Sequence, residues 1–282
     1  MNLNFSKYHG CGNDFICVDA RKIDLDVSLV AKDVCRRHFS VGADGFICLL
    51  PSDSADYKML ISNSDGSIPE MCGNGLRCFV HFLHDLGLIK DRFVSIETGA
   101  GVLKAKIVEK NGCNANVFVE MGQAYFLDQL PRNDFIFDNY SEVQIPITIG
   151  SHSLIFTPVS MGNPHAVIIV DDLDAINVMD IGSQIELHSF FPNGVNVEFI
   201  QVLNNQTVKM RVWERGVGET AACGTGACAS VVAGHLLNLL DSKEIDVQLL
   251  GGQLKVTVDM STSFVTVNGP SEFVFSSEIT LP

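Results

Sequence analysis

Two copies of a short Cys-Gly-x-Gly motif contain the residues whose types and spacing are best suited to chemistry. The first copy begins at Cys72 and the second at Cys223. A Lys-Met dipeptide begins fourteen residues before each cysteine and a histidine stands twelve residues after it, so three features repeat with one offset of 151 residues. We interpret this repeat as an internal duplication that has kept one cysteine in each half. The reactive form of a cysteine is its thiolate, so the pattern indicates thiolate chemistry at two matched places.

Each cysteine is expected at the start of a helix. Strand-like runs at 58–62 and 209–213 are followed by turn residues, and helix-like runs at 76–86 and 227–240 follow the glycines of each motif. The N-terminus of a helix offers backbone N–H groups and the positive end of the helix dipole. This placement can lower a thiol pKa from ~8.5 to roughly 3.5–7.5. We therefore expect a thiolate near neutral pH at each motif.

The other seven cysteines are expected to be small buried residues. They are Cys11, Cys17, Cys35, Cys48, Cys78, Cys113 and Cys228. The spacings from Cys72 to Cys78 and from Cys223 to Cys228 are too long for a Cys-x-x-Cys metal or redox pair. We therefore expect no metal site.

Composition narrows the class of protein. A chain of 282 residues with 46% hydrophobic and 18% charged residues suits two domains of ordinary size. A net charge of −14 argues against nucleic acid and against anionic membranes as partners. Nine cysteines without the spacing of a disulfide framework, behind an N-terminus that lacks a signal-peptide pattern, indicate a reducing compartment. The cytoplasm is the expected location.

The duplication extends beyond the cysteines. Asn13 after Gly12 is matched by Asn163 after Gly162, and the strand-like run at 264–269 matches the run at 118–122. A linker with Pro131 and Pro146 is expected to carry the chain to Ser151, and a helix is expected at 27–38. We predict an α+β fold with two pseudo-symmetric domains, each a curved, mostly antiparallel sheet around a central helix. The predicted domains are 1–122 plus about 268–282, and 123–267, with the active site in the cleft between them.

Polar residues at turn positions complete the candidate site. They are Asn13, Asn63, Asn74, Asn163, His165, Asn196, Glu214 and Arg215. Asn63 and Glu214 each stand nine residues before their cysteine, so one half has an amide where the other has an acid. Such a difference is expected if a two-fold scaffold binds an asymmetric ligand.

Five segments across the chain are recognisable together. They are Asn63-Ser64-Asp65-Gly66-Ser67, Met71-Cys72-Gly73-Asn74-Gly75-x-Arg77, Met161-Gly162-Asn163-Pro164-His165, Gly194-Val195-Asn196-Val197-Glu198-Phe199 and Glu214-Arg215-Gly216-x-Gly218-Glu219-Thr220-x-Ala222-Cys223-Gly224-Thr225-Gly226. They closely resemble the diaminopimelate epimerase family over essentially the full chain. The resemblance implies an isomerase that needs no cofactor, interconverts LL- and meso-diaminopimelate for lysine and peptidoglycan biosynthesis, and is usually a homodimer.

The same resemblance implies a role for each site residue. Cys72 and Cys223 would be the two acid–base residues, with His165 and Glu214 near the thiols. The reacting α-carboxylate would be held by Gly73, Asn74, Gly224 and Thr225. Asn13 and Glu214 would lie near the reacting ammonium group, and the distal amino acid group would contact Asn63, Asn163, Asn196 and Arg215. This chain has Gly45 where many members have a glutamine that contacts substrate, and Phe275 where many have a tyrosine associated with the dimer.

The chemistry of epimerisation agrees with this arrangement. Inverting a carbon centre requires a proton to leave one face and another to arrive on the opposite face, which two opposed thiols accomplish. Two helix N-termini aimed at the α-carboxylate would stabilise the negative charge that develops there. A pyridoxal phosphate mechanism is disfavoured, because Lys58 and Lys209 are strand residues with no phosphate-binding loop beside them.

Two alternatives remain at this point. A proline or hydroxyproline racemase would use the same pair of thiols, but a proline ring has no distal carboxylate for Arg215, which we expect to be buried. A protein that binds or senses an amino acid without catalysis would retain the cleft but would not exchange the α-hydrogen with solvent.

Overall fold

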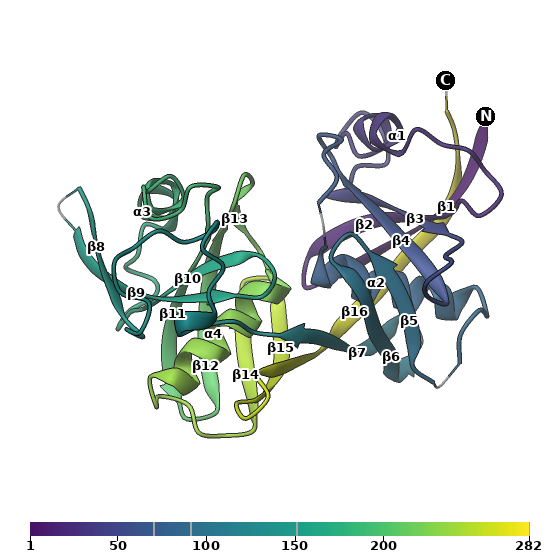
Figure 1. The fold of residues 1–282 in the computed structure, drawn as a ribbon. Coiled ribbons are helices and arrows are strands. Elements are labelled where there is room, and N and C mark those ends of the chain that lie inside the picture. Colours follow the sequence, from purple (N-terminus) through teal and green to yellow (C-terminus); the bar gives the residue numbers. More distant parts are fainter. Residues whose placement is uncertain (70, 91, 151, 282) are drawn as a thin grey trace. The chain divides into compact units, whose positions relative to one another are not determined.

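The computed structural model describes residues 1–69, 71–90, 92–150 and 152–281, and its chain divides into two compact units. Unit 1 comprises Met1–Glu120 with Asn268–Pro282, and unit 2 comprises Met121–Val267 (Figure 1). The boundaries expected from the sequence were residue 122 and about residue 268. Glu70, just before the first motif, and Ser151, the expected end of the linker, lie outside the described residues.

Unit 1 is a mixed sheet around one helix. Its strands are β1 (Asn2–Gly10), β2 (Asn13–Asp19), β3 (Gly45–Leu50), β4 (Tyr57–Asn63), β5 (Val94–Thr98), β6 (Gly101–Asn111) and β7 (Asn114–Gln123), and they are neighbours in that order. The last strand of the chain, β16 (Phe264–Thr280), pairs with β1. The pairs β2–β3 and β4–β5 are parallel. The pairs β1–β2, β3–β4, β5–β6 and β6–β7 are antiparallel, which makes the sheet mostly antiparallel.

The central helix of unit 1, α2 (Gly73–Asp85), is buried along its first eleven residues. It includes Arg77, which is 1% exposed. Its guanidinium donates to the carbonyls of Pro270 and Gly73 and to Oδ1 of Asn74. A buried cation is tolerated because these acceptors replace its water.

Unit 2 repeats this plan. Its strands are β8 (Ile145–Ile149), β9 (His152–Ser160), β10 (Pro164–Ile169), β11 (Asn196–Asn204), β12 (Thr207–Glu214), β13 (Gly218–Thr220), β14 (Glu244–Leu249) and β15 (Gly252–Asp259). A short 3-10 turn, η1 (Leu127–Gln129), precedes them. The helix α4 (Gly224–Leu236) is apolar on all sides and buried from Gly226 to Gly234, as expected for a helix enclosed by other elements. Within the described ranges, no helix is both long and apolar enough to cross a membrane.

The strand pairings of the two units repeat in register. In unit 1, β4 and β5 align Tyr57 with Ile96, and in unit 2, β12 and β14 align Val208 with Val247, an offset of 151 residues at both partners. The helix α2 packs against β1, β2, β3, β4 and β6, and α4 packs against their counterparts β9, β10, β11, β12 and β15 (Figure 1). The predicted duplication, with a mostly antiparallel sheet around a central helix in each half, is therefore confirmed.

The smaller helices are also matched, but the first is shorter than predicted. The helices are α1 (Val27–Val34) and α3 (Val178–Glu186), which begin 151 residues apart. The prediction extended the first to residue 38. It ends earlier because the chain turns back, and the N–H groups of Gly42 and Ala43 bind the carbonyls of Val34 and Cys35.

The predicted linker and the second central helix also differ from the structure. Residues 145–149 form β8 despite Pro146, which is tolerated because β8 is an edge strand that pairs with β9 alone. The second central helix, expected to continue to residue 240, spans 224–236. It ends earlier because Asn238 has a positive φ and the N–H groups of Leu239 and Leu240 turn back to the carbonyl of Gly234.

Candidate functional site

The two motif cysteines occupy the same structural position, each as the N-cap of a central helix. Cys72 caps α2 and its Sγ accepts the N–H of Gly75 at 3.4 Å. Cys223 caps α4 and its Sγ accepts the N–H of Gly226 at 3.4 Å. Both caps have an extended backbone. The predicted placement of both thiols at helix N-termini is confirmed.

In unit 1, Asn13 connects Cys72 to a polar network. The Sγ of Cys72 lies 3.7 Å from Oδ1 of Asn13, and Nδ2 of Asn74 donates to the same oxygen at 3.3 Å. On its other side, Nδ2 of Asn13 donates to the carboxylate of Asp44 at 2.9 Å. Because a carboxylate accepts only, this contact fixes the orientation of the amide, with its oxygen toward the thiol.

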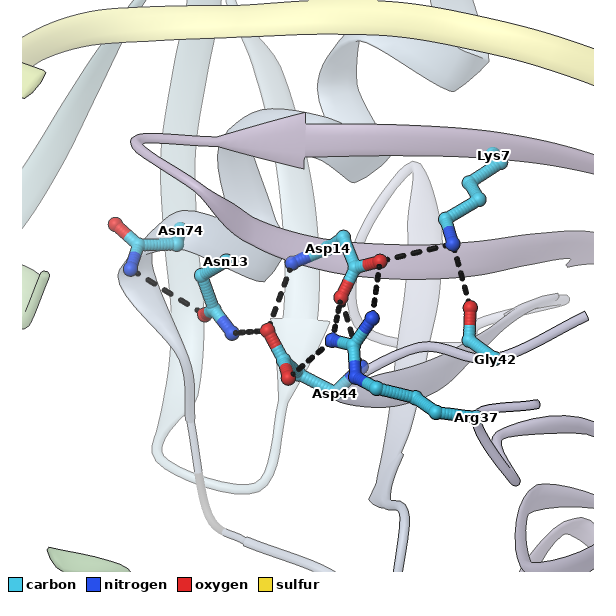
Figure 2. Close-up of polar contacts among 7 residues, drawn as sticks. All are labelled: Lys7, Asn13, Asp14, Arg37, Gly42, Asp44 and Asn74. Atoms are coloured by element: carbon cyan, nitrogen blue, oxygen red, sulfur yellow. Dashed lines mark hydrogen bonds and ion pairs between the residues drawn. The ribbon is translucent and has the colours of Figure 1, made fainter. Parts of the chain in front are cut away.

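Asp44 belongs to a cluster of two acidic and two basic side chains, which holds it in place. Figure 2 shows the guanidinium of Arg37 between Asp14 and Asp44, with Lys7 beside Asp14. Nη2 of Arg37 is 2.6 Å from Asp14 and 2.7 Å from Asp44, and Nζ of Lys7 is 2.8 Å from Asp14. Burial alone would raise the pKa of Asp14, but the hydrogen bonds from Arg37 and Lys7 bring it below its ordinary value. These two bases therefore stabilise the ionised form of Asp14. Asp44 was not predicted as a site residue, because its position next to Gly45 was the only indication in the sequence that it could lie near the site.

In unit 2, a chain of polar contacts leads from a buried pair to Cys223. The imidazole of His165 lies between Glu198, at 2.7 Å from Nδ1, and Oδ1 of Asn163, at 3.0 Å from Nε2. Asn163 donates from Nδ2 to Oγ1 of Thr225 at 3.4 Å, and that oxygen lies 3.5 Å from the Sγ of Cys223. His165 and Glu198 are both fully buried. Glu198 was not predicted as a site residue, because it lies in an apolar strand and nothing in the sequence around it indicates a functional role.

The expected low thiol pKa is not found at Cys223. Burial raises its pKa well above the ordinary value, and the nearby carboxylates of Glu214 and Glu198 raise it further. Hydrogen bonds from Thr225 and from the N–H of Gly226 act in the opposite direction but do not prevail. Cys223 is therefore a thiol at neutral pH in this structure, and the prediction of a thiolate is wrong there.

Glu214 lies beside this thiol. Burial raises its pKa, while hydrogen bonds from Thr220 and from Cys223 lower it. The hydroxyl of Thr220 donates to Oε1 at 2.5 Å. A carboxylate within hydrogen-bond reach of the thiol is placed to exchange a proton with it or to bind a cationic group of a ligand.

The remaining candidate residues lie at strand ends or just beyond them. Asn63 ends β4, Asn196 begins β11 and Arg215 follows β12. Asn196 donates to the carbonyl of Pro164 and accepts the backbone N–H of Arg215. The side chain of Arg215 was expected to be buried, but it is exposed, because it follows the last residue of β12 in the turn to β13. The side chain of Asn63 donates to Oγ of Ser67 within its own turn.

Gly45 and Phe275, the two positions at which the sequence differs from many members of the family that it resembles, both lie among the described residues. A Cβ at Gly45 would lie 3.0 Å from the carbonyl of Ser62 and 3.1 Å from the ring of Phe15, so a larger residue there requires its neighbours to shift. Phe275 is 41% exposed and contacts the ring of Phe5 edge-on. Over the residues that the structure describes, no cluster of three or more His, Cys, Asp or Glu side chains is arranged to hold a metal ion.

The sequence of this chain is similar to that of a known protein family and of individual proteins. The family model for diaminopimelate epimerase matches residues 5–127 and 157–274. The chain is 46% identical to a diaminopimelate epimerase from Halothermothrix orenii, covering 100% of this chain and 99% of the relative. It is 42% identical to one from Moorella thermoacetica, covering 99% of this chain and 100% of the relative.

Solved structures with lower identity share the fold. A hydroxyproline epimerase from Agrobacterium vitis matches with a TM-score of 0.74 and 17% identity, over 99% of this chain and 93% of that chain. A phenazine biosynthesis protein of the PhzF family from Bacillus anthracis matches with a TM-score of 0.69 and 18% identity, over 100% of both chains. The sequence comparisons are far more specific, and from them the chain belongs to the diaminopimelate epimerase family.

Proposed function

We propose that this protein interconverts LL-2,6-diaminopimelate and meso-2,6-diaminopimelate by proton transfer between two cysteines and the α-carbon, without a cofactor. The observation that carries the proposal is the pair of cysteines that cap matched helices in the two halves of a chain belonging to this family. Units 1 and 2 act as two domains that supply one thiol each.

In the proposed reaction, Cys72 and Cys223 act on opposite faces of one carbon. One thiolate removes the α-proton, and the opposite thiol delivers its proton to the other face, so the carbon inverts and the cysteines exchange protonation states. The reverse reaction begins from the exchanged states. Glu214, which accepts a hydrogen bond from Cys223, and His165, which reaches Thr225 through Asn163, support the thiols.

The helix N-termini stabilise the carbanion. Removing the α-proton places negative charge on the neighbouring carboxylate, so fixed N–H donors aimed at that carboxylate lower the barrier. We assign this role to Gly73 and Asn74 at the start of α2, and to Gly224 and Thr225 at the start of α4. The N-terminus of a helix presents backbone N–H groups and the positive end of the helix dipole, and both favour an anion.

Residues at strand ends and in turns bind the rest of the substrate. We assign Asn13 and Glu214 to the reacting ammonium group. The distal amino acid group is assigned to Asn63, Asn163, Asn196 and Arg215. The exposed guanidinium of Arg215 can bind a carboxylate with two parallel hydrogen bonds.

The proposal includes the cell context. We place the enzyme in the cytoplasm, as a homodimer, on the route to lysine and peptidoglycan precursors. Neither nucleic acid nor a membrane is a proposed partner. At Phe275, the hydroxyl of the tyrosine common in the family is missing, so the dimer depends on other contacts. Sedimentation or light scattering over a range of concentrations tests the dimer.

The direct test is turnover of LL-diaminopimelate in a reduced, cofactor-free assay. We expect meso-diaminopimelate to form until the two epimers reach equilibrium, as measured by chiral chromatography. Lysine, proline and hydroxyproline should be turned over negligibly, because none of them presents a second amino acid group to Arg215 and the asparagines. Comparable turnover of proline would assign the protein to the racemase alternative instead.

Asp44 offers a test of the unit 1 network. Replacing Asp44 by alanine removes the carboxylate that orients Asn13, so we expect kcat/KM for diaminopimelate to fall about tenfold, the value of one ordinary hydrogen bond. Thermal stability should change little, since Asp44 is 42% exposed. A matched control is Asp19→Ala, which breaks the surface pair with Arg21 in the same unit and should leave kcat/KM unchanged. An unchanged kcat/KM in Asp44→Ala contradicts the orienting role.

A further inference from the structure

A buried carboxylate lies beneath the first turn of α4. Glu198, in β11, is fully buried, and a Cβ placed on Gly226 would lie only 2.6 Å from its Oε1. The same oxygen is 2.7 Å from Nδ1 of His165, while Oε2 has no hydrogen-bond partner among the described residues. A buried acid with an unsatisfied oxygen costs free energy, so its presence calls for a reason other than stability.

The duplication provides a comparison within the same chain. The residue 151 positions before Glu198 is Ile47, in β3. It lies beneath the first turn of α2, where its Cδ1 would be 3.2 Å from a Cβ on Gly75. An apolar side chain therefore fills the matched position, and the packing of this fold does not require an acid there.

An acid in this position opposes the effect of the helix on its cap. The positive end of the α4 dipole favours a thiolate at Cys223, and a negative charge beneath the same turn offsets that effect. The charged and titratable groups that face Cys223 are Glu214 from β12, Glu198 from β11 and, through Asn163, His165 from β10. After burial and Glu214, Glu198 is the next contributor to the raised pKa of Cys223.

We propose that Glu198 is a positioning residue that keeps the proton on Cys223 in the ligand-free protein. It is not among the residues assigned to the substrate, and it acts through the electrostatic field at the start of α4. The consequence for catalysis rests on the proposed function. There, Cys223 enters the first turnover as the proton donor, and the epimer consumed first is the one whose α-hydrogen faces Cys72.

The test is the pH dependence of cysteine alkylation in the ligand-free protein. Wild type and Glu198→Gln are treated with iodoacetamide over a range of pH, and modification is followed for each cysteine peptide by mass spectrometry. We expect the midpoint for Cys223 to move to lower pH in Glu198→Gln. The ratio of its rate at pH 7 to its plateau rate should rise about tenfold. The midpoint does not depend on how accessible the thiol is, which separates charge from packing.

Controls come from the same samples. The midpoint for Cys72 should not move, and Glu198→Asp, which keeps the carboxylate, should resemble wild type at Cys223. If Glu198→Gln does not fold, Glu198→Ile repeats the apolar arrangement found at Ile47 and should shift the midpoint in the same direction. An unchanged midpoint, or a shift to higher pH, in a folded variant overturns the proposal, because it means that His165 already neutralises Glu198 or that the acid acts only in packing.

The outcome is independent of turnover. Alkylation reports the acidity of Cys223 whether or not the protein epimerises diaminopimelate. A shifted midpoint in a protein without epimerase activity would overturn the proposed function alone. Full epimerase activity with an unshifted midpoint would overturn only the role of Glu198.

Discussion

Replacing either Cys72 or Cys223 by alanine is expected to abolish epimerisation of diaminopimelate. The remaining thiol reaches one face of the α-carbon only, so a proton removed from that face has no donor on the opposite face. General acid–base groups typically contribute about 10²–10⁴-fold, and here the lost group serves an obligatory step, so the deficit should be at least that large. Both variants should stay folded, because the contact from a backbone N–H to each Sγ is long, at 3.4 Å, and its loss removes little stabilisation.

Isotope exchange distinguishes loss of one base from general inactivation. In deuterated water, each single variant should still exchange the α-hydrogen that its remaining cysteine faces, while forming no epimer. In the wild type at early times, deuterium should accumulate in the newly formed epimer, while recovered starting material stays nearly unlabelled. NMR or mass spectrometry of the separated epimers measures both.

The matched control is Cys113→Ala. Cys113 is exposed, lies in the turn between β6 and β7 and caps no helix, so this variant should keep full activity. A single-cysteine variant that epimerises at nearly the wild-type rate, or an α-hydrogen carried into product without exchange, contradicts the two-base mechanism.

The positions of the two thiols were predictable because they depend on local pattern. A cysteine followed by glycines and then by an apolar run has few backbone options other than a helix cap. The common offset of 151 residues allowed the local prediction for one half to be applied to the other half. The same offset is found in the strand registers of the two units. The sequence therefore predicted the duplicated architecture and the placement of Cys72 and Cys223.

Features that depend on packing between distant segments were not predictable. Burial, Glu214 and Glu198 together raise the pKa of Cys223. Glu198 comes from a strand 25 residues away along the chain and is indistinguishable in sequence from any other strand residue. The role of Asp44 depends on Arg37 and Asp14 meeting it in space. The strand β8 was missed because Pro146 argues against a strand, and only the edge position explains the exception. In each case tertiary contacts override the local signal.

Arg215 was assigned to the distal carboxylate of the substrate from its sequence motif. Its environment in the structure defines what a substitution there should change. Its backbone N–H is bound to Asn196. Among the described residues, its guanidinium makes one long contact, 3.4 Å from Nη1 to the carbonyl of Asn193. Because the side chain is exposed, most of its five donors are available to a ligand, and replacing it should not reduce stability.

Replacing Arg215 by methionine is therefore expected to lower kcat/KM for diaminopimelate about a hundredfold or more, because a two-pronged hydrogen bond to the distal carboxylate is lost. Arg215→Lys should recover only part of this loss, since an ammonium group keeps the charge but not the planar fork. The melting temperature of both variants should match that of wild type. The control is Arg211→Lys in the preceding strand, β12. Arg211 binds Glu219 and the carbonyls of Leu173 and Ile176, so its replacement should affect the melting temperature rather than kcat/KM. If Arg215→Met retains the wild-type kcat/KM, the distal carboxylate is bound elsewhere. If Arg215→Lys has the full wild-type kcat/KM, charge alone is sufficient and the bidentate contact is not formed.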